Sequence, residues 1–332
     1  MKIAFSTLGC PGFSWADTYT MAKDLGYNGI EIRGLGDDIF SADAKPFDES
    51  QLPQTLKKLN SLRLEIPCLS SGCCIKFAEK EEENFQEIVK YINLASKLGT
   101  PYVRILGDLE PQPKDEVDDE IVLSALRRLV PIAEEKGVTL LVETNGVYSD
   151  TARLCRLLDN IASDAVAALW DVHHPYRYAG ETPGKTVQNL GAYIKHVHVK
   201  DSVVVDGVTQ YRMIGDGDLP IDEMMMALNS INYDGFVSLE WVKCWAPDLE
   251  DAGVVFPHFA NYMSRYMEKS ESHRKSRLFD NKTKTGKYIW EKDTLIDLTF
   301  PQVLDRVVEE FPDQYAFRYT TADYTRTYSE FR

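Results

Sequence analysis

Within its first 269 residues the sequence alternates eight times between a short apolar run and a longer amphipathic segment. The short runs are rich in valine, isoleucine and leucine, which favours β-strands, and the longer segments have apolar residues at helical spacing. We predict strands at 2–7, 29–33, 64–69, 102–106, 139–143, 166–171, 194–199 and 236–240. The predicted helices are 14–25, 49–61, 79–98, 118–136, 150–161, 183–192, 221–230 and 254–269. This alternation indicates parallel strands joined by helical crossovers.

Eight such repeats in about 270 residues match the size of a (β/α)8 barrel, the TIM barrel. An open, doubly wound sheet is the alternative for alternating strands and helices. The sequence lacks the Gly-rich phosphate-binding fingerprint that often accompanies the open sheet, and the repeats are regular. We therefore predict an α/β fold, a closed (β/α)8 TIM barrel with a short C-terminal appendage.

The strands of such a barrel are apolar on the side that faces the helices. Because side chains alternate between the two faces of a strand, one apolar position fixes the whole register. Val142, Val172, Val197, Val199, Leu239 and Trp241 are then predicted to face the helices. Glu143, Asp171, His196, His198 and Glu240 are predicted to face the barrel lumen.

Four of these lumen residues end consecutive strands, namely Glu143, Asp171, His198 and Glu240. In a barrel the carboxyl ends of the strands form one rim, where TIM-barrel enzymes keep their active sites. Three carboxylates crowded together repel one another unless a cation lies among them. Three oxygen ligands and one imidazole suit Mn²⁺, Mg²⁺ or Co²⁺, and Zn²⁺ is also compatible. We predict a divalent metal site made by these four residues.

Three other polar residues are predicted to lie in or near the lumen. His174, three residues after Asp171, is a candidate to bind substrate or a carboxylate behind the metal. His196 lies deeper than His198, and we expect it to pack or to support a ligand. Glu31 and Arg33 on the second strand are expected to form an ion pair within the lumen.

The net charge of −15 lies entirely before residue 271, because the remaining residues carry equal numbers of acidic and basic side chains. Such an acidic surface repels phosphate backbones, so nucleic acid is not expected as a partner. No apolar run is long enough to span a membrane, and the N-terminus does not resemble a secretory signal. We expect a cytoplasmic protein that acts on a small molecule, with a homo-oligomer as one option for its assembly.

The four strand ends resemble the sugar phosphate isomerase/epimerase family of xylose isomerase-like barrels. Two further segments carry the resemblance, Gly215–Gly217 after the seventh strand and Asn232–Glu240 around the eighth. The resemblance covers residues 1–268 and implies that Glu143, Asp171, His198 and Glu240 bind the metal. In the ketose epimerase and hydroxypyruvate isomerase branches it also implies that Glu143 and Glu240 are the acid/base pair.

This resemblance predicts a metal-dependent isomerase or epimerase of a keto sugar, a sugar phosphate or a related polyol. Glu143 and Glu240 would move a carbon-bound proton through an enediolate intermediate of the substrate. Lys200 and Arg104 are predicted to bind a carboxylate, a phosphate or a distal hydroxyl of that substrate. His198–Asp201 also resembles inosose dehydratases, so elimination of water remains open.

Two other classes of protein are alternatives for this chain. Endonuclease IV, a DNA repair enzyme of the same superfamily, has a trinuclear zinc site with additional histidines. This chain has no histidine before His173, and the acidic surface also argues against DNA. A non-catalytic sugar-binding barrel would keep the pocket but would not need four metal ligands.

The sequence changes character after the last predicted helix. Residues 270–287 are polar and basic, which predicts a linker. Residues 288–332, with a predicted helix at 300–311 and a strand at 315–319, resemble the start of an AMP-dependent, acyl-adenylate-forming ligase. That family's ATP-binding loop lies further along and is absent, so no ATP chemistry is predicted for these residues. The resemblance implies either a ligase domain in cis in a longer chain or a ligase part that has decayed.

Overall fold

The computed structural model describes residues 1–36, 41–271, 299–310, 312, 315–319 and 324–332. It divides into two compact units, Met1–Glu268 and Lys269–Arg332. Nearly all of the predicted linker, 270–287, lies outside the described residues. The two units are described separately.

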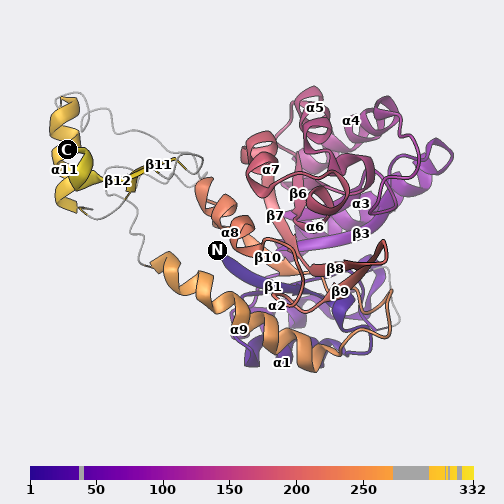
Figure 1. The fold of residues 1–332 in the computed structure, drawn as a ribbon. Coiled ribbons are helices and arrows are strands. Elements are labelled where there is room, and N and C mark those ends of the chain that lie inside the picture. Colours follow the sequence, from indigo (N-terminus) through magenta and orange to yellow (C-terminus); the bar gives the residue numbers. More distant parts are fainter. Residues whose placement is uncertain (37–40, 272–298, 311, 313–314, 320–323) are drawn as a thin grey trace. The chain divides into compact units, whose positions relative to one another are not determined.

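The first unit is built on eight parallel strands (Figure 1). They are β1 (Lys2–Ser6), β2 (Gly29–Glu31), β3 (Cys68–Cys74), β4 (Tyr102–Leu106), β5 (Thr139–Glu143), β6 (Val166–Asp171), β7 (Ile194–Val199) and β10 (Phe236–Leu239). Their order in the sheet is β2-β1-β10-β7-β6-β5-β4-β3. The two edge strands approach each other through bridges at Gly29–Glu65 and Ile32–Leu69, so the barrel is nearly closed. The predicted (β/α)8 TIM barrel is confirmed.

Helices connect the strands and cover their outer side. They are α1 (Trp15–Asp24), α2 (Leu52–Leu62), α3 (Glu81–Leu98), α4 (Asp119–Lys136), α5 (Thr151–Ile161), α6 (His173–Tyr178), α7 (Pro183–Leu190), α8 (Ile221–Ser230) and α9 (Ala252–Glu271). Side chains of Ser14, Asp118, Asp150 and Thr182 cap the starts of four of them. Such caps satisfy backbone N–H groups that have no partner within the helix. Among the described residues, none of the helices combines the length and hydrophobicity needed to cross a bilayer.

The strands bury both of their faces, as the period-two pattern requires. All six valine, leucine and tryptophan residues predicted to face the helices belong to the large core cluster around the barrel. A separate, smaller cluster of Cys68, Leu141, Ala167 and Leu169 fills the lumen. The lumen is therefore apolar at this level, and the polar residues of β5, β6 and β7 come next along the same face, toward the carboxyl ends.

The third strand differs from its prediction. The sequence indicated a strand at 64–69, whereas β3 spans Cys68–Cys74. Proline has no N–H to donate to a β-ladder, and Pro67 immediately precedes the observed strand. Residues before Pro67 make only an isolated bridge, from Glu65 to Gly29. The proline thus delays regular pairing until Cys68.

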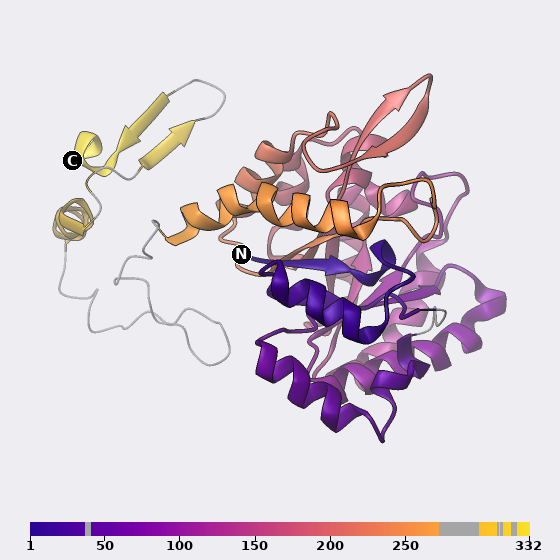
Figure 2. The same cartoon turned by 90° about the horizontal axis from the view of Figure 1, so that it is seen from below.

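A short helix and a two-stranded hairpin of the barrel unit were not predicted. The short helix α6 follows β6 directly, and an antiparallel hairpin of β8 (Asp201–Val205) and β9 (Val208–Arg212) follows β7. Asp206 and Gly207 have φ angles of 51° and 77°, in the left-handed region that two-residue hairpin turns use. Figure 2 shows the hairpin projecting from the barrel.

The second unit contains α11 (Phe300–Glu310), β11 (Tyr315–Tyr319), β12 (Tyr324–Thr327) and α12 (Tyr328–Phe331). The predicted helix at 300–311 and the predicted strand at 315–319 match α11 and β11 closely. β11 pairs with β12 in an antiparallel two-stranded sheet. Thr327 and Glu330 form a reciprocal capping box at the start of α12.

We expect the barrel unit to fold without the second unit, because all eight strands and their covering helices lie before residue 272. A chain shortened to end at Glu271, the last residue of α9, should unfold cooperatively. Its melting temperature should differ from that of the full chain by less than about 3 °C, the shift that about 1 kcal/mol produces in a domain of this size. Calorimetry of both chains tests this. Loss of a cooperative transition in the shortened chain would show that the second unit belongs to the barrel's fold.

Candidate metal and active site

The four side chains predicted as metal ligands lie together at the carboxyl ends of the strands. Glu143, Asp171 and His198 come from β5, β6 and β7, and Glu240 directly follows β10. Each offers one ligand atom, and these atoms all lie within 4.8 Å of one another. All four side chains are buried. The barrel therefore gathers three carboxylates and one imidazole in one small volume.

Strand register explains why they meet. Asp171 on β6 pairs with His198 on β7, and His198 pairs with Ser238 on β10. Glu240 lies two residues after Ser238, so it projects to the same face one step nearer the rim. Glu143 ends β5, the neighbour of β6 on the other side.

Two buried cations lie among these carboxylates. Arg104 on β4 places its Nε 3.1 Å from Glu143 Oε2, and one of its terminal nitrogens lies 3.8 Å from Glu240 Oε1. Lys200 Nζ donates to both Asp171 Oδ2 and Glu240 Oε2. Arg104 and Lys200 are only 5% and 2% exposed, so neither is a solvated charge at the rim.

These cations keep the two glutamates ionised. Burial by itself would raise the pKa of Glu143, but the nearby Arg104 outweighs it and lowers this pKa to about 2. Burial opposes ionisation of Glu240 as well, and Lys200 and His198 hold its pKa well below the usual range. In the same way Asp171 and Glu240 hold the pKa of Lys200 well above its usual range, against the effect of burial. Both glutamates are therefore bases at neutral pH.

His198 has carboxylates on both sides of its ring. Its Nε2 lies 2.8 Å from Glu31 Oε1, and its Nδ1 lies 3.5 Å from Glu143 Oε1 and 3.3 Å from Glu240 Oε1. Burial would lower the pKa of His198, but Glu31 and Glu240 raise it well above the usual range. Nδ1 is buried and makes no hydrogen bond of normal geometry.

Glu31 corrects one expectation. The sequence suggested an ion pair between Glu31 and Arg33, but the Glu31 carboxylate is bound by His196, His198 and Ser70. The Arg33 guanidinium lies 5.9 Å from the ring centre of Trp245. The role of Glu31 was missed because 167 residues separate it from His198, and a single strand-end glutamate carries no signal by itself.

His174 lies beside the carboxylate cluster. Its Nδ1 is 3.1 Å from the carbonyl oxygen of Thr144, and its Nε2 is 3.7 Å from Asp171 Oδ2. Nε2 is buried and has no hydrogen-bond partner. Burial lowers the pKa of His174, so a neutral ring faces the site. The adjacent His173 bonds to Ser202 instead.

The residues present fit a divalent cation. The four buried carboxyl groups of Glu31, Glu143, Asp171 and Glu240 outnumber the two buried basic side chains, Arg104 and Lys200. Nδ1 of His198 and Nε2 of His174 are buried polar atoms without hydrogen-bond partners at the edge of this cluster. Three carboxylate oxygens and one imidazole nitrogen on four neighbouring strands form a common ligand set for such an ion.

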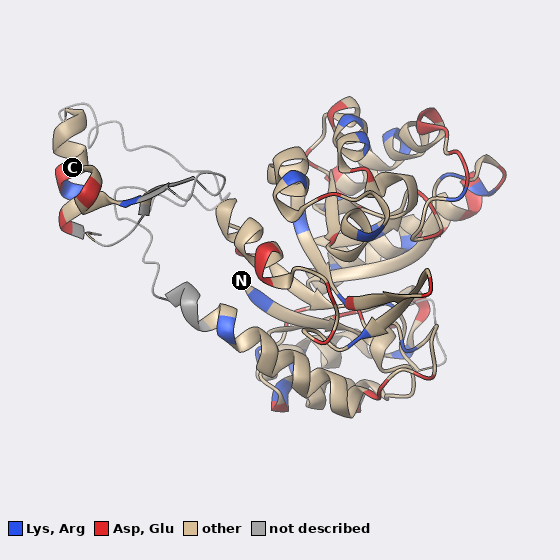
Figure 3. Cartoon of the chain, in the orientation of Figure 1, with Lys and Arg blue, Asp and Glu red and all other residues tan. Residues whose placement is uncertain are grey.

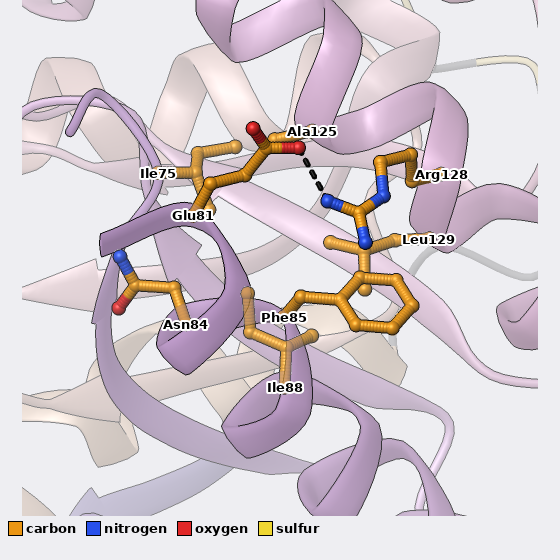
Figure 4. Close-up of a pocket in the computed structure, with 8 residues that line it drawn as sticks. All are labelled: Ile75, Glu81, Asn84, Phe85, Ile88, Ala125, Arg128 and Leu129. Atoms are coloured by element: carbon orange, nitrogen blue, oxygen red, sulfur yellow. Dashed lines mark hydrogen bonds and ion pairs between the residues drawn. The ribbon is translucent and has the colours of Figure 1, made fainter. Parts of the chain in front are cut away.

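Two of the hollows near the barrel's helices and loops differ in their position and lining. One, of about 300 Å³, is on the same rim and is lined by Thr7, Leu8, Pro11, Arg33, Gly34, Gly36, Cys244 and Trp245. The other, of about 250 Å³, lies between α3 and α4 (Figure 4). It is mostly apolar, and Arg128 pairs with Glu81 and lies 4.4 Å from the ring centre of Phe85. The second hollow contains none of the predicted site residues.

The charged side chains on the surface, unlike the buried cluster, are spread over many separate positions. Asp and Glu side chains, red in Figure 3, recur along the outer helices and loops of the barrel. Many of them pair with Lys or Arg at exposed positions, for example Glu65 with Lys2 and Glu49 with Lys97. Exposed pairs of this kind contribute little to stability, so the buried cluster is the electrostatically distinctive part of the barrel.

The chain is similar in sequence to known enzymes and similar in structure to solved barrels. Fructoselysine 3-epimerase from Shigella flexneri is 24% identical over 259 residues, which cover 74% of this chain and 91% of the relative. Inosose dehydratase 2 from Bacillus cereus is 29% identical over 143 residues, 38% of this chain and 47% of the relative. The crystal structure of the IOLI protein with a zinc atom superimposes with a TM-score of 0.66 at 17% identity, covering 81% of this chain and 99% of that one.

The family model of the xylose isomerase-like TIM barrel matches residues 20–253. This range ends before the second unit, so the resemblance of residues 288–332 to an AMP-dependent ligase stays a prediction. The matched range contains all four strand-end residues of the carboxylate and imidazole cluster. The chain belongs to the xylose isomerase-like TIM barrel family.

Proposed function

We propose that this protein is a divalent-metal-dependent isomerase or epimerase of a keto sugar, a sugar phosphate or a related polyol. The observation that carries the proposal is the cluster of Glu143, Asp171, His198 and Glu240, whose ligand atoms lie within 4.8 Å of one another. The fructoselysine 3-epimerase that matches over most of its length supports a sugar epimerase rather than another barrel activity.

In this proposal Glu143, Asp171, His198 and Glu240 hold the metal ion. When bound, a divalent ion polarises a substrate carbonyl and stabilises the negative charge that develops on its oxygen. Mn²⁺, Mg²⁺ and Co²⁺ suit the three carboxylates, and Zn²⁺ is also compatible with the set.

Glu143 and Glu240 are proposed to move the proton. Both are ionised because Arg104 and Lys200 stabilise their negative charges. Each can therefore accept a proton from the carbon next to a carbonyl. Glu143 and Glu240 come from different strands of the barrel. This suits removal of the substrate's proton by one glutamate and its return by the other. Return to the neighbouring carbon gives isomerisation, and return to the other face of the same carbon gives epimerisation.

His174, Lys200 and Arg104 are proposed to bind the substrate. The Nε2 atom of His174 is buried at the site without a hydrogen-bond partner and is available to a hydroxyl. Lys200 and Arg104 are held by carboxylates at the site, so their remaining donors have a fixed direction. Pre-set donors bind an oxygen atom at low entropic cost.

Dehydration is the second candidate. Inosose dehydratases share segments of this sequence, and Lys200 donates to Glu240 at the site. A glutamate that removes the carbon-bound proton and an ammonium that protonates the departing hydroxyl would together eliminate water. Product analysis separates this reaction from epimerisation, because only elimination changes the substrate's mass.

Metal binding is the first prediction. The full chain should bind one divalent ion per molecule, and His198→Ala should weaken Mn²⁺ binding by more than about 100-fold, since even residues behind the ligands cost 10- to 100-fold. Isothermal titration with Mn²⁺ measures both quantities. His258→Asn is the matched control, because His258 bonds to the carbonyl oxygen of Ile214 and is not in the cluster. Unchanged Mn²⁺ affinity in His198→Ala would contradict the proposed site.

The proton-transfer pair gives the second prediction. Glu143→Gln and Glu240→Gln should each slow exchange of the substrate's carbon-bound proton with deuterated solvent by about 10²- to 10⁴-fold, because the amide cannot act as the base. Proton NMR in D2O follows the exchange, with fructoselysine and inosose as test substrates.

Metal content must be measured in the same samples, because both glutamates are proposed ligands. Glu181→Gln is the control for the exchange of a carboxylate for an amide, since Glu181 binds Thr151 outside the cluster. Full exchange in metal-loaded Glu143→Gln/Glu240→Gln would exclude the pair as the proton carriers.

A further inference from the structure

Glu31 is the most completely bonded carboxylate in the described lumen. Its Oε1 accepts hydrogen bonds from Ser70 Oγ and from His198 Nε2 at 2.8 Å, and its Oε2 accepts from His196 Nε2 at 2.9 Å. All four side chains are buried, with exposed fractions of 1% or less. A buried carboxylate of this kind persists only when its charge and its oxygen atoms are satisfied.

The bonds of Glu31 cross the barrel. Glu31 lies on β2, Ser70 on the adjacent β3, and both histidines on β7. Two other strands, β1 and β10, separate β2 from β7 in the sheet order. The contact is therefore made through the lumen and not along the sheet, and it fixes the His198 ring from behind.

The chemistry of a carboxylate determines which nitrogen of His198 faces the site. Both oxygens of the Glu31 carboxylate are hydrogen-bonded, Oε1 to Ser70 and His198 and Oε2 to His196. An ionised carboxylate only accepts hydrogen bonds, so Nε2 of His198 must carry a proton. Nδ1 is then the ring atom directed at Glu143 and Glu240, and it is the atom without a hydrogen-bond partner.

We propose that Glu31 is a positioning residue of the metal site, which fixes the ring orientation and the tautomer of His198. His196 and Ser70 hold Glu31 in turn, so a chain of hydrogen bonds from three strands presents Nδ1 of His198 to the metal. Support of a ligand histidine by a carboxylate on its other nitrogen raises the ligand's basicity and limits its rotation. This inference rests on the proposed metal site.

A second metal ion is the competing interpretation of the same residues. Ligand atoms of Glu31, His196 and His198 also lie within 4.8 Å of one another. Hydrogen bonding accounts for them better, because both oxygens of Glu31 already lie at hydrogen-bond distance from a ring nitrogen. A closed metal site usually has a fourth ligand, and the group contains three. The two interpretations differ in the number of metal ions bound.

Glu31→Gln tests the proposal. A glutamine side chain has one acceptor oxygen and one donor NH2, so it cannot accept from both histidines. One ring must change its tautomer or turn, and we expect zinc affinity to fall by about 10- to 100-fold while one ion still binds. Isothermal titration with Zn²⁺ measures affinity and stoichiometry on the full chain, with Glu181→Gln as the matched control that keeps wild-type affinity.

The tautomer gives a readout that a merely structural role would not move. Long-range ¹H–¹⁵N spectra of histidine-labelled, zinc-loaded protein should show His198 protonated at Nε2 and bound through Nδ1. Ser70→Ala removes one hydroxyl and leaves both histidine contacts, so it should fold even if Glu31→Gln does not. Its zinc affinity should fall less than that of Glu31→Gln but measurably below wild type.

The outcomes separate this inference from the proposed function. If the wild type binds one zinc ion and neither Glu31→Gln nor Ser70→Ala changes the affinity, the positioning role is wrong and the metal site stands. If the wild type binds no zinc, the proposed metal site itself fails. If it binds two ions and His196→Asn removes one of them, Glu31 is a ligand of a second site and not a positioning residue.

Discussion

The site depends on the mutual neutralisation of buried charges at one end of the barrel. Glu143, Asp171 and Glu240 are desolvated together, and each alone would be costly to ionise in that position. Arg104 and Lys200 offset this cost through short contacts, and Glu143 and Glu240 remain charged as a result. Removal of one partner from such a group leaves an uncompensated charge, so the set behaves as a unit.

The strands carry apolar residues deep in the lumen and polar residues near their carboxyl ends. The lumen is apolar at the level of Leu141, Ala167 and Leu169, and polar one or two residues further along. The apolar layer supports the strand ends from below, while the outer faces of the same strands pack against the helices. Rigid strands on both sides allow ligand atoms from β5, β6, β7 and the end of β10 to be held within a few ångströms.

Much of this arrangement could be predicted from the sequence, because alternation along a strand is a local pattern. The valines around Glu143 and His198 identify the helix-facing side, and the polar residues between them must then face the lumen. The bounds of β3 could not be predicted in this way, because Pro67 interrupts the alternation of apolar residues before Cys68. The hairpin that begins at Asp201 was missed because its strands are partly exposed, with weak apolar alternation.

Contacts across the lumen are the part that a sequence pattern does not contain. Glu31 and His198 meet because the barrel curves round on itself, and neither residue's neighbours indicate the other. The burial of Lys200 and Arg104 has the same origin: a charged residue at a strand end resembles an exposed one until the opposite strands are in place.

The junction between β2 and β3 lacks the continuous ladder found between the other neighbouring strands, and has two isolated bridges. The hydrogen bond from Ser70 to Glu31 joins side chains on the two sides of this seam. The carboxylate that orients His198 thus also links β2 to β3. A change in the spacing of β2 and β3 would therefore displace the carboxylate that holds the His198 ring, so the geometry of this junction and the geometry of the candidate metal site are linked.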